Sequence, residues 1–351
     1  METIHCFGVG LVGSYVVRRL AAKGHLIHAY DLDPSVVDNV ENVVAHKISS
    51  DFPKDQFFAG ISGSLVLNML PGSIGSEWTR AMCGHRMKII DLSFSEVTPD
   101  VSASEAAQHG SRVLWDVGIA PGLSNMFAIQ GHRSLGPLES LKIWVGGNPV
   151  HPEGKWSYMA PFSPTDVIEE YTRPARVMIE GREVIIPALS DRHEISVPGH
   201  GEMEAFLTDG LRSLTTSIPC SEMAEYTVRW PGHIQCYLEY VESGQLDQAR
   251  LIEEWKYDPE TPEFTWLKVK AQNRLGQSVE WVLEDNGGKD GHSMARTTGL
   301  VTAICAEMIL EDEDLVPLGV HPPEVLPDHA ISRIVSEMRD SGVSINGPTF
   351  N

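Results

Sequence analysis

Three glycines near the start of the chain constrain its fold more than any other feature. Gly8, Gly10 and Gly13 stand between an apolar run, 3–7, and a helix-compatible run, 14–23. At such a strand-to-helix turn the first glycine permits a tight bend, the second lets backbone approach a pyrophosphate, and the third lets the helix pack closely on the strand. The pattern predicts a dinucleotide-binding βαβ unit. The residues expected at the phosphates are Gly8, Gly10, Leu11, Val12 and Gly13.

A carboxylate at the end of the second expected strand bears on the choice of cofactor. Asp31 follows the strand-like run 26–30 and lies 18 residues after Gly13. A carboxylate at this place accepts hydrogen bonds from an adenosine ribose and repels a 2′-phosphate, which favours NAD over NADP. The alternative is that Asp31 only caps the turn 31–34.

Up to about residue 125, strand-like and helix-like segments alternate, which predicts a parallel sheet. Three further apolar runs, 64–70, 87–92 and 113–117, have the composition of strands covered on both faces. Doubly wound sheets bind ligands at the carboxyl ends of their strands. The loops expected at the ligand cleft are therefore 70–72, 93–95 and 116–122, and the side chains expected against the cofactor are Leu70, Pro71 and Ser93.

The pattern changes after residue 123. Period-two alternation in 264–271 and 278–284 flanks a turn at 273–276, which predicts a hairpin, and helical spacing returns in 294–310 and 329–339. The expected fold class is α/β, with a Rossmann-type doubly wound parallel sheet and a second α+β domain with a mixed, largely antiparallel sheet. The expected divisions are 1–125 for NAD binding, 126–293 for substrate binding and dimerisation, and 294–351 for helices that pack back on the first domain.

Charge and composition argue against several kinds of partner. The 351 residues carry a formal net charge of −21 without a cluster of Lys and Arg, which argues against nucleic acid and anionic membranes. No stretch is apolar enough to span a bilayer and the first residues lack the order of a signal peptide, so we expect a cytoplasmic protein. The five cysteines, and the His and Glu residues within 193–204, show no zinc spacing, so we expect no metal.

The stretch 163–176 offers the best candidates for substrate binding. Ser163 and Pro164 suit the N-cap and the first helical position, so a short helix is expected to end near residue 172. Arg173 and Arg176 would emerge at its end, where a guanidinium can match the two oxygens of a carboxylate. The alternative is a surface arginine that pairs with a nearby glutamate or stabilises the helix C-terminus.

Several longer strings occur in the order seen in one enzyme family. They are Asp116–Asn125, Trp144–Gly147, Phe162–Arg176, Thr208–Arg212 and Arg229–His233. Together with the glycines at 8–13 and the segment 294–299 they cover nearly the whole chain, and EEYTRPAR at 169–176 is a specific string. The chain thereby resembles the saccharopine dehydrogenase-like family, and within it the members that oxidise the side-chain amine of lysine.

The resemblance implies NAD-dependent oxidative deamination of the ε-amine of L-lysine. The products would be ammonia, NADH and 2-aminoadipate 6-semialdehyde, which cyclises to piperideine-6-carboxylate. The resemblance also implies a homodimer built through the sheet of the second domain. For single residues it implies Asp116 in proton handling, with ordering of the turn 118–122 as the structural alternative. The other site candidates are His233 for proton transfer, Tyr171 and Arg173 at the substrate with Arg173 on its α-carboxylate, Arg212 as the second choice for that carboxylate, and Asp209 for the α-ammonium.

Two other functions stay open at this point. The segment 151–161 departs from the pattern of the lysine enzymes, which leaves room for a related amine. Reductive condensation of an amine with an aldehyde or keto acid, as in saccharopine or carboxynorspermidine formation, would need two basic anchors, and this region of the chain supplies several arginines. The remaining alternative is a non-catalytic NAD-binding sensor, against which the presence of both Asp116 and Arg173 argues.

Overall fold

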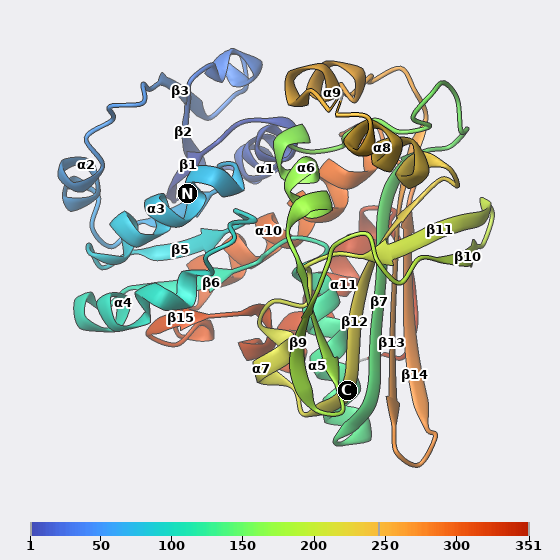
Figure 1. Cartoon of the computed structure of the whole chain (residues 1–351). Coiled ribbons are helices and arrows are strands. Elements are labelled where there is room, and N and C mark those ends of the chain that lie inside the picture. Colours follow the sequence, from blue (N-terminus) through green and yellow to red (C-terminus); the bar gives the residue numbers. More distant parts are fainter. Residues whose placement is uncertain (1, 245, 350–351) are drawn as a thin grey trace. The chain divides into compact units, whose positions relative to one another are not determined.

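A computed structural model describes residues 2–244 and 246–349, and the chain forms two compact units (Figure 1). Unit 1 consists of the residues up to Leu123 and of Ala295–Met338. Unit 2 holds Ser124–Met294 and the C-terminal segment from Arg339. In the described residues, no helix combines the length and the apolar character that crossing a bilayer needs.

Unit 1 is built on a parallel sheet in the strand order β3-β2-β1-β4-β5-β6-β15. The order reverses at β1, which pairs with β2 on one side and with β4 on the other. This is a Rossmann-type sheet, so the fold predicted from the alternating segments is confirmed. Its strands are β1 (Thr3–Phe7), β2 (Leu26–Asp31), β3 (Val43–Lys47), β4 (Leu65–Asn68), β5 (Lys88–Asp91), β6 (Arg112–Trp115) and β15 (Gly319–His321).

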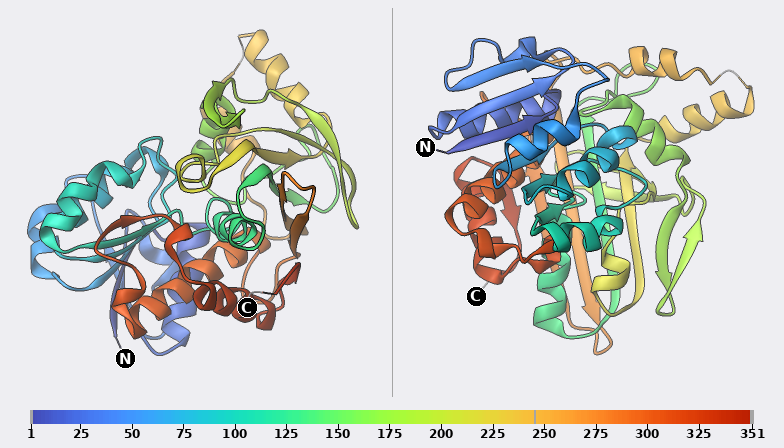
Figure 2. Two further views of the ribbon diagram at one scale, coloured as in Figure 1. Left: turned by 90° about the horizontal axis from the view of Figure 1, so that it is seen from below. Right: turned by 90° about the vertical axis from the view of Figure 1, so that its left-hand side faces the viewer.

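Helices cover both faces of this sheet (Figures 1 and 2). On one face, Phe58 and Trp78 pack their rings against Phe7, with ring centroids 5.6 and 5.0 Å away. On the other face two helices approach closely, because a Cβ on Gly299 would lie 2.4 Å from the ring of Tyr15. The helices that begin or lie in this unit are α1 (Leu11–Ala22), α2 (Lys54–Gly60), α3 (Gly72–Cys83), α4 (Ala103–His109), α10 (Ser293–Glu311) and α11 (Asp328–Asp340).

Unit 2 contains a mixed sheet in the order β10-β11-β12-β7-β13-β14-β16, and β8 pairs with both β12 and β9. Strands β7 and β12 run parallel, and the other pairs are antiparallel. The predicted hairpin forms, with Gln272 opposite Ser278. The strands are β7 (Leu138–Pro149), β8 (Ala175–Ile179), β9 (Arg182–Ile186), β10 (His193–Val197), β11 (Gly201–Leu207), β12 (Cys220–Arg229), β13 (Glu263–Asn273), β14 (Ser278–Asp285) and β16 (Ser344–Asn346).

The helices of unit 2 include the short one expected after residue 163. Ser163 Oγ accepts a hydrogen bond from the amide of Asp166 at 3.4 Å, and Pro164 occupies the first turn, so the predicted N-cap is confirmed. Another helix packs on the sheet by stacking the Phe127 ring on Trp281, with centroids 5.3 Å apart. The helices are α5 (Leu123–Leu135), α6 (Pro164–Thr172), α7 (Leu214–Ser217), α8 (His233–Glu242) and α9 (Gln248–Glu254).

The C-terminal segment differs from the expected grouping of 294–351 with the first domain. Strand β16 pairs with β14, Ile345 lying opposite Leu283, and the Arg339 guanidinium donates to the carbonyl of Ile345. The residues from 339 therefore fall in unit 2. A strand of three residues carries too little alternation to be recognised from its sequence.

Candidate functional site

The three glycines at 8–13, here called the glycine loop, serve the backbone in different ways. Gly8 has a φ of +91°, and a Cβ on it would lie 2.5 Å from the carbonyl oxygen of Met69. A Cβ on Gly13 would lie 2.1 Å from the carbonyl oxygen of Gly8. A Cβ on Gly10 would meet no described atom within 4 Å. The fold itself therefore demands Gly8 and Gly13, whereas Gly10 borders open space.

The helix that follows the glycine loop offers hydrogen-bond donors beside that space. Helix α1 begins at Leu11 with Gly10 as its N-cap. The amides of Leu11, Val12 and Gly13 belong to the first turn, where no carbonyl of the same helix lies one turn earlier to accept from them. Free amides at a helix N-terminus and an unobstructed approach fit the pyrophosphate of a dinucleotide.

Asp31 connects the end of β2 to the glycine loop. Its Oδ2 accepts a hydrogen bond from the amide of Val9 at 2.7 Å, and its Oδ1 accepts one from the amide of Asp33 at 3.0 Å. The second bond is the turn cap that the sequence offered as an alternative. A carboxylate has about four lone-pair positions, so the two bonds leave acceptor capacity for a ribose hydroxyl. The ribose contact of Asp31 stays a prediction.

The expected cofactor loops lie at the carboxyl ends of β4 and β5 and pack tightly together. A Cβ on Gly75 would lie 2.1 Å from Cβ of Ser93. Ser93 is buried, and its amide and hydroxyl both donate to Oδ1 of Asp91, at 2.7 and 2.6 Å. The Ser93 hydroxyl is thus engaged by the protein. The other two candidates in these loops, Leu70 and Pro71, directly precede α3.

Asp116 follows β6 in an unusual backbone conformation. Its φ is +55° and the residue is 3% exposed. The turn behind it needs glycine, because a Cβ on Gly122 would lie 2.0 Å from the carbonyl oxygen of Gly118. Residues other than glycine that adopt a left-handed backbone conformation are often found at functional sites, although Asp tolerates this conformation better than most other residues do. The proton-handling and the turn-ordering roles of Asp116 both stay predictions.

In unit 2, a row of polar side chains lies on one face of β12. Glu225, Thr227 and Arg229 are two residues apart, so they point to the same face, and all are buried. The segment before α7 crosses this row, where the Thr208 amide donates to the carbonyl of Glu225 and the Thr208 and Thr227 hydroxyls lie 2.8 Å apart. Charged groups from this segment and from the end of α6 interact electrostatically with the row. We call the resulting set the charge cluster: Glu170, Arg173, Asp209, Arg212, Glu225 and Arg229.

Two members of the charge cluster have charged partners outside it. Asp209 accepts hydrogen bonds from Nε and Nη2 of Arg176, both at 2.7 Å, and from the Arg176 amide at 3.2 Å. This bidentate contact speaks against Asp209 as the receiver of a substrate ammonium. Arg173 directly follows α6 and forms an ion pair with Glu169 at 3.0 Å, the local contact that the sequence had offered as its alternative role. Its side chain is nevertheless only 8% exposed.

Arg212 and Glu225 are two deeply buried charged groups of the cluster. Arg212 is 2% exposed and has a φ of +44°. Gly210 is required beside them, because a Cβ there would lie 1.4 Å from Oε2 of Glu225. Burial, with the nearby carboxyls of Glu170 and Asp209, raises the pKa of Glu225 well above its usual value, although the Gly210 amide and Arg212 oppose the shift. The Glu225 carboxyl is therefore held toward its neutral form.

Tyr171 and His233 take part in a buried chain of hydrogen bonds. Nε of Arg229 donates to the Tyr171 hydroxyl at 3.0 Å, that hydroxyl lies 2.9 Å from Nε2 of His233, and Nδ1 of His233 lies 2.9 Å from the carbonyl oxygen of Trp156. Because a carbonyl only accepts, Nδ1 carries the proton and Nε2 accepts from the tyrosine. Burial and the Arg229 charge lower the pKa of His233 to about 3. The imidazole is thus neutral near pH 7 with both nitrogens engaged, which favours a positioning role over proton transfer.

Glu170, Glu225 and Tyr158 were not among the site residues predicted from the sequence. Tyr158 accepts a hydrogen bond from Nη2 of Arg229 at 3.4 Å, and burial raises its pKa to about 12. Two signals could have found the glutamates. Glu225, Thr227 and Arg229 alternate with the hydrophobic residues Ala224, Tyr226 and Val228, and Glu170 lies inside the specific string at 169–176.

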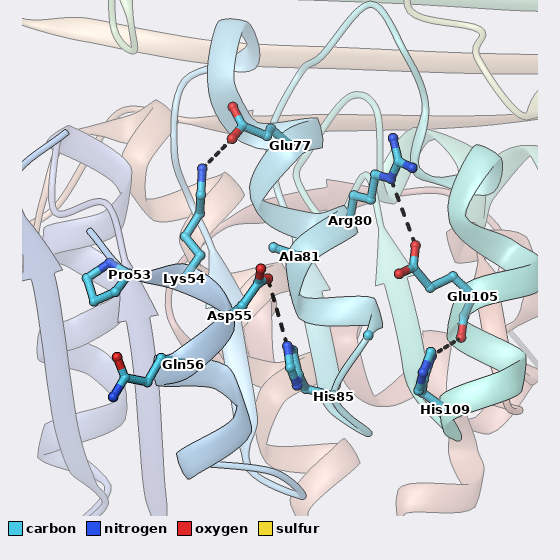
Figure 3. Close-up of a pocket in the computed structure, with 11 residues that line it drawn as sticks. Pro53, Lys54, Asp55, Gln56, Glu77, Arg80, Ala81, His85, Glu105 and His109 are labelled. Atoms are coloured by element: carbon cyan, nitrogen blue, oxygen red, sulfur yellow. Dashed lines mark hydrogen bonds and ion pairs between the residues drawn. The ribbon is translucent and has the colours of Figure 1, made fainter. Parts of the chain in front are cut away.

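A groove of about 590 Å³ lies elsewhere in unit 1, among α2, α3 and α4 (Figure 3). Its charged side chains pair with one another, Lys54 with Glu77, and Arg80 with Glu105 at 3.9 Å. Its lining includes none of the side chains that the sequence singled out. In the described parts of the chain, no three His, Cys, Asp or Glu side chains are grouped so that they could hold a metal ion.

Two solved structures share the fold of this chain. Ligand-free saccharopine dehydrogenase (L-Glu forming) from Saccharomyces cerevisiae matches with a TM-score of 0.76 and 15% identity, over 99% of this chain and 100% of that chain. Homospermidine synthase from Legionella pneumophila, solved with NAD, matches with a TM-score of 0.73 and 11% identity, over 99% and 91%. At these identities the likeness extends to the fold alone.

The family follows from a direct match of the sequence. The family model for the saccharopine dehydrogenase C-terminal domain matches residues 118–343, well over half of the chain. The matched range contains the charge cluster and begins two residues after Asp116. The chain therefore belongs to the saccharopine dehydrogenase family of NAD(P)-dependent dehydrogenases.

Proposed function

We propose that this protein is an NAD-dependent L-lysine 6-dehydrogenase, which converts the side-chain amine of L-lysine to 2-aminoadipate 6-semialdehyde and releases ammonia and NADH. The observation that carries the proposal is the charge cluster of unit 2, in which guanidinium and carboxyl groups are buried together. Buried charges need partners, and a site of mixed sign suits a zwitterionic amino acid better than an apolar or purely anionic substrate. The string EEYTRPAR further supports an amine substrate, through its resemblance to the lysine-oxidising members.

NAD, when bound, supplies the acceptor for the hydride that leaves the substrate carbon. In the proposal the amides of Leu11, Val12 and Gly13 hold the pyrophosphate, and Gly10 leaves the approach open. Asp31 uses its remaining lone pairs for the adenosine ribose, and its negative charge disfavours the 2′-phosphate of NADP. Leu70, Pro71 and Ser93 line the cofactor from the neighbouring loops.

The reaction needs at least one group that takes protons. A charged ammonium cannot release hydride, so the reacting amine must first lose a proton, and the water that attacks the resulting iminium must lose one as well. We assign this role to Asp116. This residue directly follows β6 of the Rossmann sheet, at the ends of the strands where such sheets bind ligands. Arg173 is assigned to the substrate α-carboxylate and Arg212 is the second candidate, because a guanidinium matches both carboxylate oxygens.

We also propose that the protein is a homodimer formed through the sheet of unit 2, an arrangement that the family resemblance supports. Light scattering on the purified protein should then give twice the chain mass of 38.7 kDa. A mass of 38.7 kDa at micromolar concentration would contradict the dimer.

A second candidate function is the reductive condensation of an amine with an aldehyde or keto acid. The observation in its favour is that two arginines are buried. The side chain of Arg173 is 8% exposed and the residue Arg212 is 2% exposed, so two carboxylates could be anchored. This reaction would consume NADH or NADPH rather than form it.

One assay distinguishes these functions. Purified protein is mixed with NAD or NADP and each of L-lysine, D-lysine, ornithine, alkyl diamines and saccharopine, and the NADH absorbance band is followed. The proposal expects NADH with L-lysine and little signal with NADP. Oxidation of NADH by an aldehyde or keto acid together with an amino acid would favour the condensing enzyme. NADH binding without turnover in any mixture would favour a non-catalytic sensor.

A further inference from the structure

The charge cluster contains carboxyl oxygens that lack hydrogen-bond donors. Oε2 of Glu170 and Oε2 of Glu225 are both buried and accept no hydrogen bond from the described residues. An unsatisfied buried acceptor is costly, so each oxygen calls for a donor that a ligand or water supplies. A substrate ammonium carries such donors.

Of the two side chains, Glu170 is the less deeply buried. Glu225 is 4% exposed and lies against Gly210, whose missing side chain would collide with it. The Glu170 side chain is 17% exposed. Asp209, the carboxylate that the sequence suggested for the ammonium, is already held by Arg176 through both of its oxygens.

The arginine beside Glu170 does not satisfy it. Nη2 of Arg229 lies 3.8 Å from Oε2 of Glu170, beyond hydrogen-bond distance. Arg229 instead donates from Nε to the Tyr171 hydroxyl, from Nη1 to the carbonyl of Val228 and from Nη2 to the Tyr158 hydroxyl. The guanidinium therefore contributes charge near Glu170 but no hydrogen bond.

Glu170 is also suitably placed relative to the proposed carboxylate anchor. Glu170 and Arg173 are three residues apart at the end of α6, a spacing that places side chains on the same side of a helix, and the two charges interact. The α-ammonium and α-carboxylate of an amino acid are bonded to one carbon, so their anchors must be neighbours. A glutamate and an arginine at this spacing match that requirement.

We propose that Glu170 binds the α-ammonium of the substrate and forms, with Arg173, a clamp that selects α-amino acids over simple amines. This inference rests on the proposed function for the identity of the substrate. The clamp holds the end of the substrate that does not react. It therefore sets which amines are accepted and leaves the proton chemistry to Asp116.

The clamp couples binding to pH. Burial raises the pKa of Glu170 to about 7, opposed by Arg229. A bound ammonium favours the ionised carboxyl, so a substrate that binds near pH 7 releases a proton from Glu170, whereas well above pH 7 none is left to release. The titratable and charged groups that interact with Glu170 are Asp166 and Tyr171 of α6, Arg173 directly after it, Tyr158, and Glu225 and Arg229 of β12.

The test compares substrates that each lack one group of lysine. 6-Aminohexanoate lacks the α-ammonium and cadaverine lacks the α-carboxylate. For the wild-type enzyme we expect kcat/KM for L-lysine to exceed that for 6-aminohexanoate by about 10- to 100-fold, the value of one charged hydrogen bond. In Glu170→Gln that ratio should fall to within about threefold through a higher KM for lysine, while the lysine-to-cadaverine ratio stays as in the wild type.

Two further variants control this comparison. Glu242→Gln removes an exposed glutamate from α8 of the same unit and should leave both ratios unchanged. Glu170→Asp keeps the charge on a shorter side chain and should retain part of the discrimination, whatever the effect of glutamine on folding. If both variants of Glu170 discriminate against 6-aminohexanoate as the wild type does, Glu170 does not bind the α-ammonium, and the proposed function still stands.

Calorimetry tests the inference without turnover. L-Lysine is titrated into wild-type protein and into Glu170→Gln at pH 7, in buffers of different ionisation enthalpy. The wild type should release about half a proton more than the variant, because a group with a pKa near 7 is half protonated there. Equal proton release, or no binding of L-lysine to the wild type, would overturn the clamp. Proton release without NAD reduction in any mixture would support the clamp and overturn the dehydrogenase.

Discussion

The glycine loop of unit 1 and the charge cluster of unit 2 are two candidate sites built in opposite ways. In the glycine loop, six consecutive residues form the site, and it depends on side chains that are absent: Gly8 and Gly13 leave room for backbone, and Gly10 leaves room for a ligand. In the charge cluster and its hydrogen-bonded neighbours, residues from 158 to 233 come together from a sheet, a helix and the segment before α7, and hydrogen bonds between side chains join these elements.

The difference bears on how each site should respond to substitution. A backbone site tolerates almost no change at the glycines that the fold needs, because added atoms meet main chain that cannot move aside. A side-chain network distributes its energy over many partners, so single changes weaken it in steps. Cofactor binding should therefore fail abruptly and substrate binding gradually.

The largest effect is expected within the glycine loop. Gly13→Ala places a Cβ 2.1 Å from the carbonyl oxygen of Gly8, so it should abolish NAD binding and lower the melting temperature. Gly10→Ala meets nothing within 4 Å and should keep the wild-type melting temperature while weakening NAD binding. Thermal melts and NADH fluorescence titrations check both. If the two variants had the same melting temperature and the same NAD affinity, the fold would not require Gly13 more than it requires Gly10.

Asp116→Asn should have the next largest effect. Asparagine keeps the size and most of the hydrogen-bonding capacity but removes the base, so kcat should fall by about 10²–10⁴ with NAD binding unchanged. The acidic limb of the kcat profile should change or vanish. His233→Asn should leave that limb in place, because a histidine with a pKa of about 3 does not titrate there. Wild-type turnover in Asp116→Asn would mean that another residue is the base.

Arg173→Lys tests the charge cluster. A lysine ammonium retains the charge but cannot offer two parallel donors to a carboxylate, so KM for L-lysine should rise by about 10- to 100-fold with kcat little altered. Initial rates across a range of lysine concentrations measure this. An unchanged KM would remove Arg173 from the site and make Arg212 the anchor.

A smaller change is expected in the choice of cofactor. The double substitution Asp31→Asn, Leu32→Arg removes the negative charge at the ribose and adds a guanidinium at a position that is 64% exposed. The ratio of affinities for NADP and NAD should rise by about tenfold or more, the worth of one charged hydrogen bond. Asparagine retains one acceptor oxygen for the backbone amides that Asp31 now holds. A constant ratio would mean that Asp31 serves only the turn.

The smallest expected effect is on stability. The pKa of Glu170 is raised above its usual value, so the folded state favours the neutral form, and this group's contribution to stability is lost as pH rises through about 7. Glu170→Gln should melt like the wild type near pH 4.5 and a few degrees above it at pH 8. A constant difference across this range would show that burial does not shift Glu170.

The parts of the molecule that sequence could predict are those built from local pattern. The Rossmann sheet, the hairpin at 273–276 and the N-cap at Ser163 each depend on residues close in the chain, and each is confirmed. The long-range ion pair between Arg176 and Asp209 could not be predicted, because nothing in the sequence indicates that these two residues, 33 positions apart, meet. The sequence likewise could not show that His233 is buried. Burial lowers the pKa of this histidine, so a side chain that commonly titrates near pH 7 is uncharged there.

The position of the transferred hydrogen tests the proposed function most directly. L-Lysine with both hydrogens of its ε-carbon replaced by deuterium is incubated with the protein and NAD, and the mass of the NADH formed is measured. Oxidation of the side-chain amine predicts NADH heavier by one deuterium, together with release of ammonia. Unlabelled NADH would place the hydride donor at another carbon, and the absence of NADH would contradict lysine as the substrate.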